Sequence, residues 1–392
     1  MSSIRCLLKP GKEKPVLAHH PWIFSGALDQ IDDGYKPGDL VQVYSSSEEM
    51  LGLGFLNPDS QIAVRMLTFG AAEIDESFFR ARIRKSLELR KQFVPAGTNS
   101  YRLIHSESDF LPGLTVDLYG DYLSVQIHAI GMERWKDVIL KILQEEIPLK
   151  GIYEKMDAEW RKIEGLKGKP GLLWGAEPPD ELEILENGLK FLVDIKHGQK
   201  TGFFLDQREN RKLVGEHSRG KKLLNCFSYS AGFSVYGARG GALSTVSVDS
   251  SDTALNLASK NLTLNGFSEK DHRCLHTDVF QYLRQGNEPF DFIVLDPPAF
   301  CQSKAHVDNA SRAYKDVNMI AMKRLSEGGL LFTASCSSFI SVDLFQKILF
   351  GAAKDTGKNI RILAKTGHPF DHPVNIYFPE GEYLKGFLCR VE

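Results

Sequence analysis

Short stretches in which apolar and polar residues alternate dominate the first part of the chain. They lie between Ile4 and Phe69, are separated by turn residues, and are clearest at 39–44, 52–55 and 62–66. Alternation with a period of two is typical of β-strands that bury one face. We therefore predict a small β-barrel over residues 1–72.

The middle of the chain combines helical and strand-like patterns. Apolar residues recur at helical spacing over 74–90 and again over 133–146, with strand-like stretches between them and at 152–155. A stretch rich in glycine and proline at 167–179 is typical of a linker. We predict a central α+β domain over residues 73–188.

Continuous apolar runs separated by helical segments characterise the remainder of the chain. The runs lie at 222–226, 245–249, 292–296 and 329–334. Strands that are apolar on both faces and alternate with helices, such as the one expected over 252–264, indicate a parallel sheet with crossover helices. We therefore predict a Rossmann-like domain over residues 189–392, in a multidomain α/β protein.

Composition fits a globular protein of several domains. Hydrophobic residues make up 42% and charged residues 25% of the 392 residues, and no apolar run approaches the roughly 20 residues that cross a bilayer. The N-terminal segment has no signal-peptide pattern, so we expect a cytoplasmic protein without membrane partners. The six cysteines lie far apart and form no zinc-binding pattern, so we expect reduced thiols and no metal.

Net charge gives no simple argument for nucleic-acid binding, since it is only −2 at pH 7. A nucleic-acid partner would have to meet a local basic patch. One candidate is a basic cluster on the helix predicted at 74–90 and just beyond it, formed by Arg80, Arg82, Arg84, Lys85, Arg90 and Lys91. A solvated helix face explains the same cluster equally well.

Ligands of open α/β sheets bind at the carboxyl ends of the strands, so the residues that follow each apolar run are the candidates for a site. The first run leads into a loop of small residues, 227–233, that would let a ligand approach the backbone at a helix N-terminus. The second run ends in Asp249, which could accept hydrogen bonds from ribose hydroxyls or simply cap the next helix. Asp278, after a strand-like stretch, could contact an adenine amino group or act as a cap.

The fourth run ends in Asp296-Pro297-Pro298-Ala299-Phe300, and this motif is more specific. Two prolines directly after a buried strand fix an extended exit and hold the aspartate and the aromatic ring toward the strand ends. A loop, two acids and an Asp-Pro-Pro-aromatic motif in this order resemble class I S-adenosylmethionine-dependent methyltransferases. A nicotinamide-dependent enzyme would carry a glycine-rich fingerprint instead.

Cys336 follows the next apolar run, which places a thiol at the same sheet edge as Asp296. A thiolate that adds to C6 of a pyrimidine makes C5 nucleophilic enough to accept a methyl group. Asp296 could hold the cytosine edge, and Phe300 could stack on an extruded base. The alternatives are a small buried hydrophobe for Cys336 and core packing for Phe300. Cys301 could assist product release, which we do not expect.

The sequence resembles, nearly end to end, the bacterial ribosomal RNA large subunit methyltransferase I family, which forms 5-methylcytosine in 23S ribosomal RNA (rRNA) and has an N-terminal PUA domain. The motifs that carry the resemblance are His20–Ala27, Leu111–Leu114, Gly198–Arg208 and Tyr377–Phe387. The sequence departs from the family pattern at Phe110 and Ala231, where glycine is common, and at Ala299, where lysine is common. The missing lysine at position 299 removes a possible phosphate contact, which concerns the grip on RNA and not the reaction.

The resemblance implies S-adenosylmethionine as cofactor and Cys336 as the nucleophile, with Asp296 as the second catalytic residue. The implied cofactor-binding residues are Gln207, Arg208, Phe227, Ser228, Tyr229, Ser230, Gly232, Asp249, Ser250, Asp278, Val279 and Asp296. The implied substrate-binding residues are Lys200, Pro297, Pro298 and Phe300. Arg208 could pair with the methionine carboxylate of the cofactor or form a surface salt bridge.

Two other functions stay open at this point. Enzymes on a similar scaffold methylate N7 of guanine, and Asp-Pro-Pro-aromatic motifs also occur in enzymes that methylate exocyclic amines; neither reaction needs a thiol. A non-catalytic RNA-binding protein is the third reading. The expected partner is 23S rRNA or an assembly intermediate of the large subunit, contacted through the PUA-like barrel and the central domain. A homodimer is left open.

Overall fold

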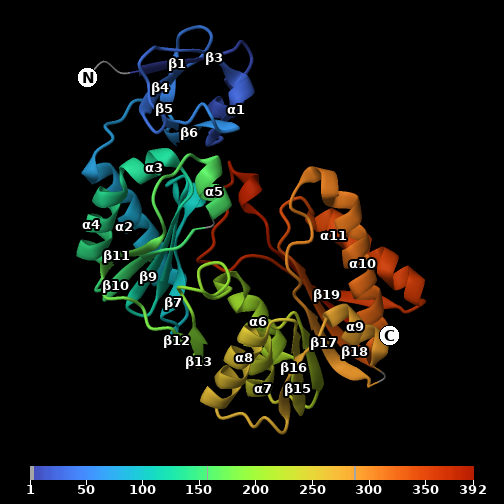
Figure 1. Cartoon of the computed structure of the whole chain (residues 1–392). Helices are drawn as coiled ribbons and strands as arrows, with labels where there is room; N and C mark the ends of the chain where they lie inside the picture. Colours follow the sequence, from blue (N-terminus) through green and yellow to red (C-terminus); the bar gives the residue numbers. More distant parts are fainter. Residues whose placement is uncertain (1–3, 157, 287) are drawn as a thin grey trace. The chain divides into compact units, whose positions relative to one another are not determined.

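The chain divides into two compact units in the computed structural model, which describes residues 4–156, 158–286 and 288–392 (Figure 1). The first unit comprises Met1–Leu182, Asp194–Phe203 and Phe370–Gly381. The second unit comprises Glu183–Val193, Phe204–Pro369 and Glu382–Glu392. Two segments of the range predicted as catalytic, 194–203 and 370–381, thus belong to the first unit.

The first sheet of unit 1 has six strands in the order β2-β6-β5-β4-β1-β3 and curls around its own apolar core (Figure 1). Its strands are β1 (Ile4–Leu8), β2 (Trp22–Phe24), β3 (Leu28–Ile31), β4 (Leu40–Tyr44), β5 (Met50–Leu56) and β6 (Ile62–Thr68), with helix α1 (Lys14–Leu17) between the first two. The three strands predicted at 39–44, 52–55 and 62–66 are confirmed as β4, β5 and β6. Alternation explains the agreement, because Val41 and Val43 point into the core while Leu40, Gln42 and Tyr44 are partly exposed.

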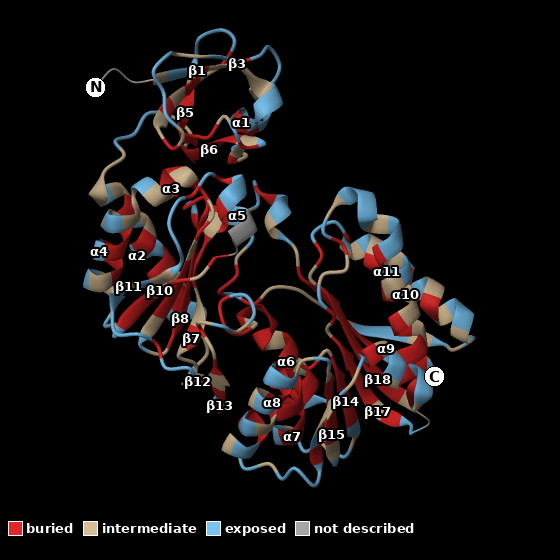
Figure 2. Cartoon of the chain, viewed as in Figure 1, coloured by how far each residue is buried: buried red, intermediate tan, exposed pale blue. Residues whose placement is uncertain are grey.

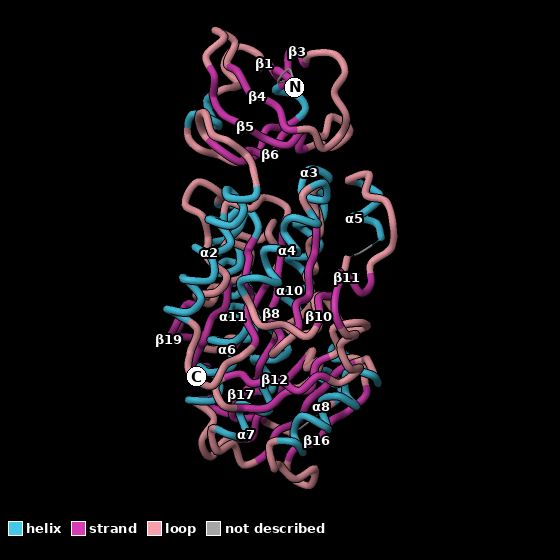
Figure 3. The backbone as a smooth tube through the Cα atoms, turned by 90° about the vertical axis from the view of Figure 1, so that its left-hand side faces the viewer, coloured by secondary structure: helices cyan, strands magenta, loops and turns pink. Residues whose placement is uncertain are grey.

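The second sheet of unit 1 has five strands in the order β11-β10-β9-β8-β7. They are β7 (Ser100–His105), β8 (Leu114–Tyr119), β9 (Tyr122–Ile127), β10 (Gly151–Glu154) and β11 (Gly171–Gly175), and α5 (Ala158–Ile163) lies between the last two in sequence. Helices α2 (Glu76–Phe93) and α4 (Lys136–Glu146) cover one face of this sheet (Figure 3). The second predicted helix, 133–146, begins as a separate short helix α3 (Ile130–Arg134).

The glycine-rich stretch at 167–179 is not a linker, because it contains strand β11. This strand pairs antiparallel with β10, and Gly151 lies opposite Gly175. A Cβ atom at Gly175 would lie 2.2 Å from the carbonyl oxygen of Lys150, and one at Gly151 would lie 2.1 Å from that of Ala176. The glycines therefore permit close approach of two backbones, which the sequence pattern alone does not distinguish from a flexible connection.

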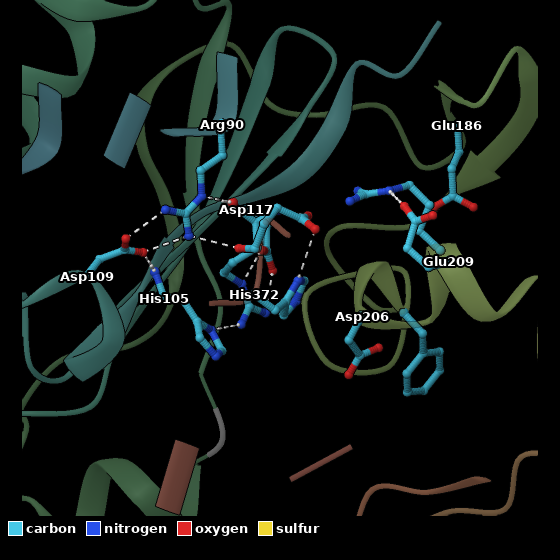
Figure 4. A network of polar contacts seen from close by, with 12 residues as sticks. Arg90, His105, Asp109, Asp117, Glu186, Asp206, Glu209 and His372 are labelled. Atoms are coloured by element: carbon cyan, nitrogen blue, oxygen red, sulfur yellow. Dashed lines mark hydrogen bonds and ion pairs between the residues drawn. The ribbon is translucent and has the colours of Figure 1, made fainter. Parts of the chain in front are cut away.

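The basic residues of α2 are engaged mainly in ion pairs and other contacts within unit 1. As a group, they do not form a patch that is free to bind RNA. Arg90 is fully buried, and its guanidinium group donates to both carboxylate oxygens of Asp109 at 2.7 Å and to the carbonyl oxygen of Asp371 at 2.8 Å (Figure 4). Arg80 is ion-paired with three glutamates of unit 1. Of the six residues proposed as an RNA-binding cluster, Arg90 is thus excluded by burial, and it instead ties segment 370–381 to the first unit.

Unit 2 is built on a seven-stranded sheet in the order β16-β15-β14-β17-β18-β20-β19, whose inner strands are largely buried (Figure 2). Its strands are β14 (Lys222–Cys226), β15 (Ser244–Asp249), β16 (His272–His276), β17 (Phe290–Leu295), β18 (Leu325–Ser335), β19 (Ile360–Thr366) and β20 (Lys385–Val391). The first five strands in this order are parallel, as predicted. The last two strands were not predicted, and they join through antiparallel pairs, β20 with β18 and β19 with β20.

Helices cover both faces of this sheet. Helices α6 (Arg208–Glu216), α7 (Gly232–Arg239) and α8 (Asp252–Leu264) lie on one side, and α9 (Val279–Gln285), α10 (Val307–Arg324) and α11 (Val342–Thr356) on the other (Figure 1). The hairpin β12 (Leu182–Glu186) and β13 (Leu189–Val193) precedes α6 in sequence. Within the described ranges, no helix has the length and apolar character that crossing a membrane requires.

Candidate active site

The carboxyl ends of four adjacent parallel strands define one edge of the sheet in unit 2. In the order β15-β14-β17-β18, Val248 is paired with Cys226, Cys226 with Leu295, and Leu295 with Thr333. Asp249, the loop at 227–231, Asp296 and Cys336 therefore leave the sheet at the same edge, where α/β folds bind ligands. The structure thus brings together the strand-end residues singled out in the sequence.

The loop after β14 has an unusual backbone conformation. Phe227, Tyr229 and Ala231 all have positive φ angles, of 57°, 45° and 60°. Left-handed backbone costs a non-glycine residue roughly 1 kcal/mol, and such strain concentrates at functional sites. Ala231, where glycine is common in the family, is one of these three positions. Glycine suits the position because it adopts a positive φ angle without strain.

Hydrogen bonds from neighbouring elements hold this loop. The amide of Ser228 donates to the carbonyl oxygen of Val248 at 3.0 Å, and the side-chain amide of Asn261 on α8 donates to that of Ser230 at 3.1 Å. The hydroxyl oxygen of Ser228 is buried and has no hydrogen-bond partner in the described chain. A buried polar atom of this kind is suited to a polar ligand, and the loop therefore fits an S-adenosyl cofactor.

Asp249 fastens the loop to the end of β15. One carboxylate oxygen accepts a hydrogen bond from the amide of Tyr229 at 2.9 Å, and the other accepts one from the amide of Ser251 at 3.0 Å. Ser251, not Asp249, caps α8 by accepting from the amide of Ala254. The alternative reading of Asp249 as a helix cap is therefore wrong, and each carboxylate oxygen keeps a further lone pair that a ribose hydroxyl could use.

The other predicted cofactor residues have different surroundings. Asp278 is exposed and caps α9, accepting from the amide of Gln281 at 2.8 Å, while Val279 is buried in the core. Ser250 is exposed beside Asp249. Gly232 opens α7, where a Cβ atom would lie 2.8 Å from the side chain of Arg211. Their contacts with a cofactor stay predictions.

Arg208 forms an ion pair with Glu209 at 3.1 Å, so a salt bridge is present, but the arginine side chain is fully buried and does not lie on the surface. Its pairing with the methionine carboxylate of the cofactor stays a prediction. Lys200 lies in the first unit, is exposed and has a positive φ of 49°. Its contact with a substrate therefore stays a prediction.

A short series of amide hydrogen bonds orients Asp296. The side-chain amide of Gln207 donates to one carboxylate oxygen of Asp296 at 2.8 Å, and Asn210 on α6 donates to the carbonyl oxygen of the same Gln207 amide at 2.6 Å. Because Asn210 fixes which end of the amide faces Asp296, the carboxylate meets a donor. Gln207 was predicted from the sequence to bind the cofactor, and Asn210 was not identified.

Phe300 belongs to an aromatic cluster under the strand ends. Its ring centroid lies 4.7 Å from that of Tyr314, and the rings of Phe227 and Phe280 lie just over 6 Å away. The core packing considered as the alternative is thus present, and stacking on a base stays a prediction. Pro297 is buried and Pro298 is exposed at the exit of β17.

Cys336 differs from most cysteines of the chain in being partly exposed. Cys6, Cys226, Cys301 and Cys389 are buried, and Cys274 is the other partly exposed cysteine. Burial raises the pKa of the Cys274 thiol to about 11. The alternative of a small buried hydrophobe therefore does not describe Cys336. Cys301 is buried, and its thiol donates to the carbonyl oxygen of Ser303 at 3.2 Å.

The turn that carries Cys336 is held from several sides. Tyr314 on α10 forms hydrogen bonds of 3.0 Å with the hydroxyl groups of Ser335 and Ser337, which flank the cysteine. Lys385 on β20 donates to the carbonyl oxygen of Ser337 at 2.6 Å. Neither Tyr314 nor Lys385 was identified from the sequence, although Lys385 lies within one of the motifs that carried the resemblance. No group of His, Cys, Asp and Glu residues suited to a metal ion occurs within the described part of the chain.

Comparisons with known proteins agree with this architecture. A family model described as S-adenosylmethionine-dependent methyltransferase matches residues 170–356, and one for a PUA-like domain matches residues 7–69. A crystal structure with S-adenosylhomocysteine bound, provisionally assigned as a methyltransferase, is 26% identical in sequence; the match covers 98% of this chain and 99% of that one, with a TM-score of 0.86. A structure from Streptococcus mutans, provisionally assigned as an S-adenosylmethionine-dependent methyltransferase, is 27% identical with the same coverage and a TM-score of 0.84.

The sheet order, the strand-end site and these matches define a class I S-adenosylmethionine-dependent methyltransferase with an N-terminal PUA-like domain. The predicted cofactor and fold class are thereby confirmed. Proteins named ribosomal RNA large subunit methyltransferase I from Alteromonas mediterranea and Aeromonas salmonicida are 42% and 43% identical, over 99% of this chain and 99% of each relative. The chain belongs to the ribosomal RNA large subunit methyltransferase I family.

Proposed function

We propose that this protein methylates C5 of a cytosine in 23S rRNA and that Cys336 is the nucleophile. The observation that carries the proposal is the partly exposed thiol at the carboxyl end of β18, at the sheet edge that also carries Asp249 and Asp296. The names of the full-length relatives support ribosomal RNA of the large subunit as the substrate.

The thiol supplies the step that C5 methylation needs. The thiolate of Cys336 forms a bond to C6, and the electron pair of the C5–C6 double bond becomes available at C5. The cofactor, when bound, supplies an electrophilic methyl group on a sulfonium. After C5 has taken this methyl group, a base removes the C5 proton, the C5–C6 double bond re-forms, and the sulfur leaves as thiolate. The cysteine is thus regenerated in each cycle.

Asp296 suits the role of holding the pyrimidine edge. Gln207 occupies one carboxylate oxygen, and the aspartate is partly exposed where the strand ends. The carboxylate could accept a hydrogen bond from the exocyclic amine of cytosine and favour protonation of the base at N3. Hydrogen bonding at N3 draws electrons from C6 and favours attack by the thiolate.

Two alternatives make different use of these residues. N7 of guanine and exocyclic amines are nucleophilic without a covalent intermediate, so an enzyme of that kind would not depend on Cys336. A protein that only binds RNA would depend on none of the strand-end residues. The hydrogen-bonded Asp249 and Asp296 favour an enzyme, and the partly exposed Cys336 favours C5.

The experiment is methyl transfer from labelled S-adenosylmethionine to unmodified 23S rRNA, followed by digestion to nucleosides and identification of the labelled product. We expect 5-methylcytidine from the wild type and none from Cys336→Ala. Cys274→Ala, which changes the other partly exposed cysteine, should keep the wild-type rate. Labelled 7-methylguanosine or an N-methylated nucleoside, or full activity in Cys336→Ala, would refute the proposal.

The same assay addresses the remaining parts of the proposal. We propose a cytoplasmic enzyme that acts on 23S rRNA or an assembly intermediate, gripping RNA through the PUA-like and central domains of unit 1. Supplying naked rRNA and immature large subunits in parallel, at equal RNA concentration, distinguishes the two substrates. Mapping the label along the RNA then identifies the nucleotide, and sedimentation tests whether the enzyme is a homodimer.

A further inference from the structure

Lys385 is a buried lysine beside the proposed nucleophile, and its role is not explained by the features described so far. It opens β20 and is paired with Ser335, the last residue of β18, immediately before Cys336. Only 3% of its surface is exposed. Its ammonium group donates to the carbonyl oxygens of Ser337 and Ile340, the two ends of the turn that follows the cysteine.

The charge of Lys385 lacks the partner that buried lysines usually have. Within the described ranges, its ammonium group forms hydrogen bonds with two backbone carbonyl oxygens and no ion pair with a carboxylate. Burial lowers the pKa of Lys385 to about 8. The nearby Cys336 sulfur and, to a smaller extent, Glu382 raise this pKa through their negative charge. A buried cation without a paired anion is costly, so a chain that retains one is expected to use its charge.

Two other titratable groups act at this turn, and neither is a cation. Tyr314 approaches from α10 and is hydrogen-bonded to the hydroxyl groups of Ser335 and Ser337. Burial raises the pKa of Tyr314, and Cys336 adds to this effect, so the phenol stays neutral. Glu382 precedes β20 and is the acidic group that acts on Lys385.

We propose that Lys385 is a positioning residue for the nucleophile, whose ammonium group fixes the 337–340 turn and stabilises the thiolate form of Cys336. This inference rests on the proposed function, in which the thiolate adds to C6 and is later expelled. A fixed cation beside the sulfur favours the thiolate both before addition and after elimination. As a positioning residue, Lys385 exchanges no proton with the substrate.

The test is the pH dependence of Cys336 alkylation by iodoacetamide in the full-length protein, read by mass spectrometry without RNA or cofactor. Cleavage by trypsin after Arg324 and Lys347 gives a peptide in which Cys336 is the single cysteine. We expect Lys385→Met to slow alkylation at pH 7 about tenfold and to move the titration midpoint upward, because only the thiolate reacts. Cys274, on another tryptic peptide, should titrate unchanged and serves as the internal reference.

Further variants separate charge from hydrogen bonding and from folding. Lys385→Arg keeps the cation and should restore most of the alkylation rate, whereas Lys385→Gln keeps a donor without the charge and should resemble Lys385→Met. Lys358→Met is the matched control, because Lys358 also donates to a backbone carbonyl, that of Leu325, and burial likewise lowers its pKa. It should leave the Cys336 titration unchanged. Thermal unfolding of each variant confirms that the comparison concerns folded protein.

The outcomes distinguish this inference from the proposed function. An unchanged Cys336 titration in folded Lys385→Met, or in folded Lys385→Gln if the Met variant does not fold, would overturn the role of Lys385. The proposed function would still stand if Cys336→Ala had lost methyl transfer. Conversely, a shifted titration together with full 5-methylcytidine formation by Cys336→Ala would refute the proposed function while confirming the electrostatic coupling.

Discussion

The hydrogen bond between Gln207 and Asp296 leads to a sharp prediction about substrate activation. Gln207→Met replaces a buried amide by an apolar side chain of similar length, and one oxygen of Asp296 then loses its donor at 2.8 Å. If Asp296 holds the pyrimidine, the loss should appear in the rate of methyl transfer. If Gln207 binds the cofactor instead, as its place in the sequence motif predicts, the loss should appear in cofactor affinity.

The size of the effect follows from the geometry. A hydrogen bond to a charged group contributes about 1.5–3 kcal/mol. Asp296 is partly exposed, so water can replace part of the lost bond, and we take the lower end of this range. At about 1.4 kcal/mol per tenfold change in rate, methyl transfer should slow about tenfold.

The assay measures single-turnover methyl transfer to 23S rRNA and, separately, the Kd for S-adenosylmethionine by calorimetry. Gln207→Met should lose rate with little change in Kd. Asn210→Ala should have a smaller effect in the same direction, because the Gln207 amide can then turn its oxygen toward Asp296. Gln281→Met, on the exposed side of α9, is the control for the same chemical change and should behave as wild type. A Kd weakened tenfold with the rate retained would refute this reasoning.

Three further predictions concern stability, cofactor affinity and pH. Arg90→Met should lower the free energy of unfolding in urea by about 3–5 kcal/mol, because it leaves the buried carboxylate of Asp109 without its cation; a loss below 1 kcal/mol would contradict this, and adding Asp109→Asn should recover part of it. Asp249→Ala should weaken S-adenosylmethionine binding at least tenfold in calorimetry, since it frees the amides of Tyr229 and Ser251 and removes the acceptors for ribose, and an unchanged Kd would exclude that role. Burial lowers the pKa of His128 to about 4 from an ordinary value of 6.5, so its protonation opposes folding: the free energy of unfolding should be highest above pH 6.5 and fall as the pH drops toward 4. The contribution at pH 4.5 is on the order of 2 kcal/mol; His128→Gln should remove it from urea unfolding curves, and an identical pH dependence in the variant would argue against it.

Elements with a clear hydrophobic period could be predicted from the sequence. Elements that form only by pairing with a strand distant in the sequence could not. Strands β4, β14 and β17 combine apolar positions with bounding turns, and they were placed to within two residues. Strand β11 was missed because its glycines serve close backbone pairing with β10, a long-range relation. The antiparallel edge of the sheet in unit 2 depends in the same way on β20 inserting beside β18.

The candidate site shows the same division. Strand ends can be located from apolar runs, which is why Asp249, Asp296 and Cys336 were found. The residues that support them come from elsewhere in the chain: Asn210 acts through Gln207, and Tyr314 and Lys385 reach the cysteine turn from α10 and β20. A local pattern carries no signal for such contacts. The exposed side chains of Ser250 and Asp278 show the opposite case, in which a motif position alone does not establish a contact.

The most direct test of the account is a covalent bond between Cys336 and the base. RNA that carries 5-fluorocytidine at the modified position allows thiolate addition and methyl transfer, but the fluorine at C5 replaces the proton whose removal releases the enzyme. The account predicts an adduct that is stable in denaturant, requires S-adenosylmethionine, maps to the peptide containing Cys336 and is absent from Cys336→Ser. Methylation of ordinary RNA without any such adduct, or an adduct mapping to another residue, would contradict it.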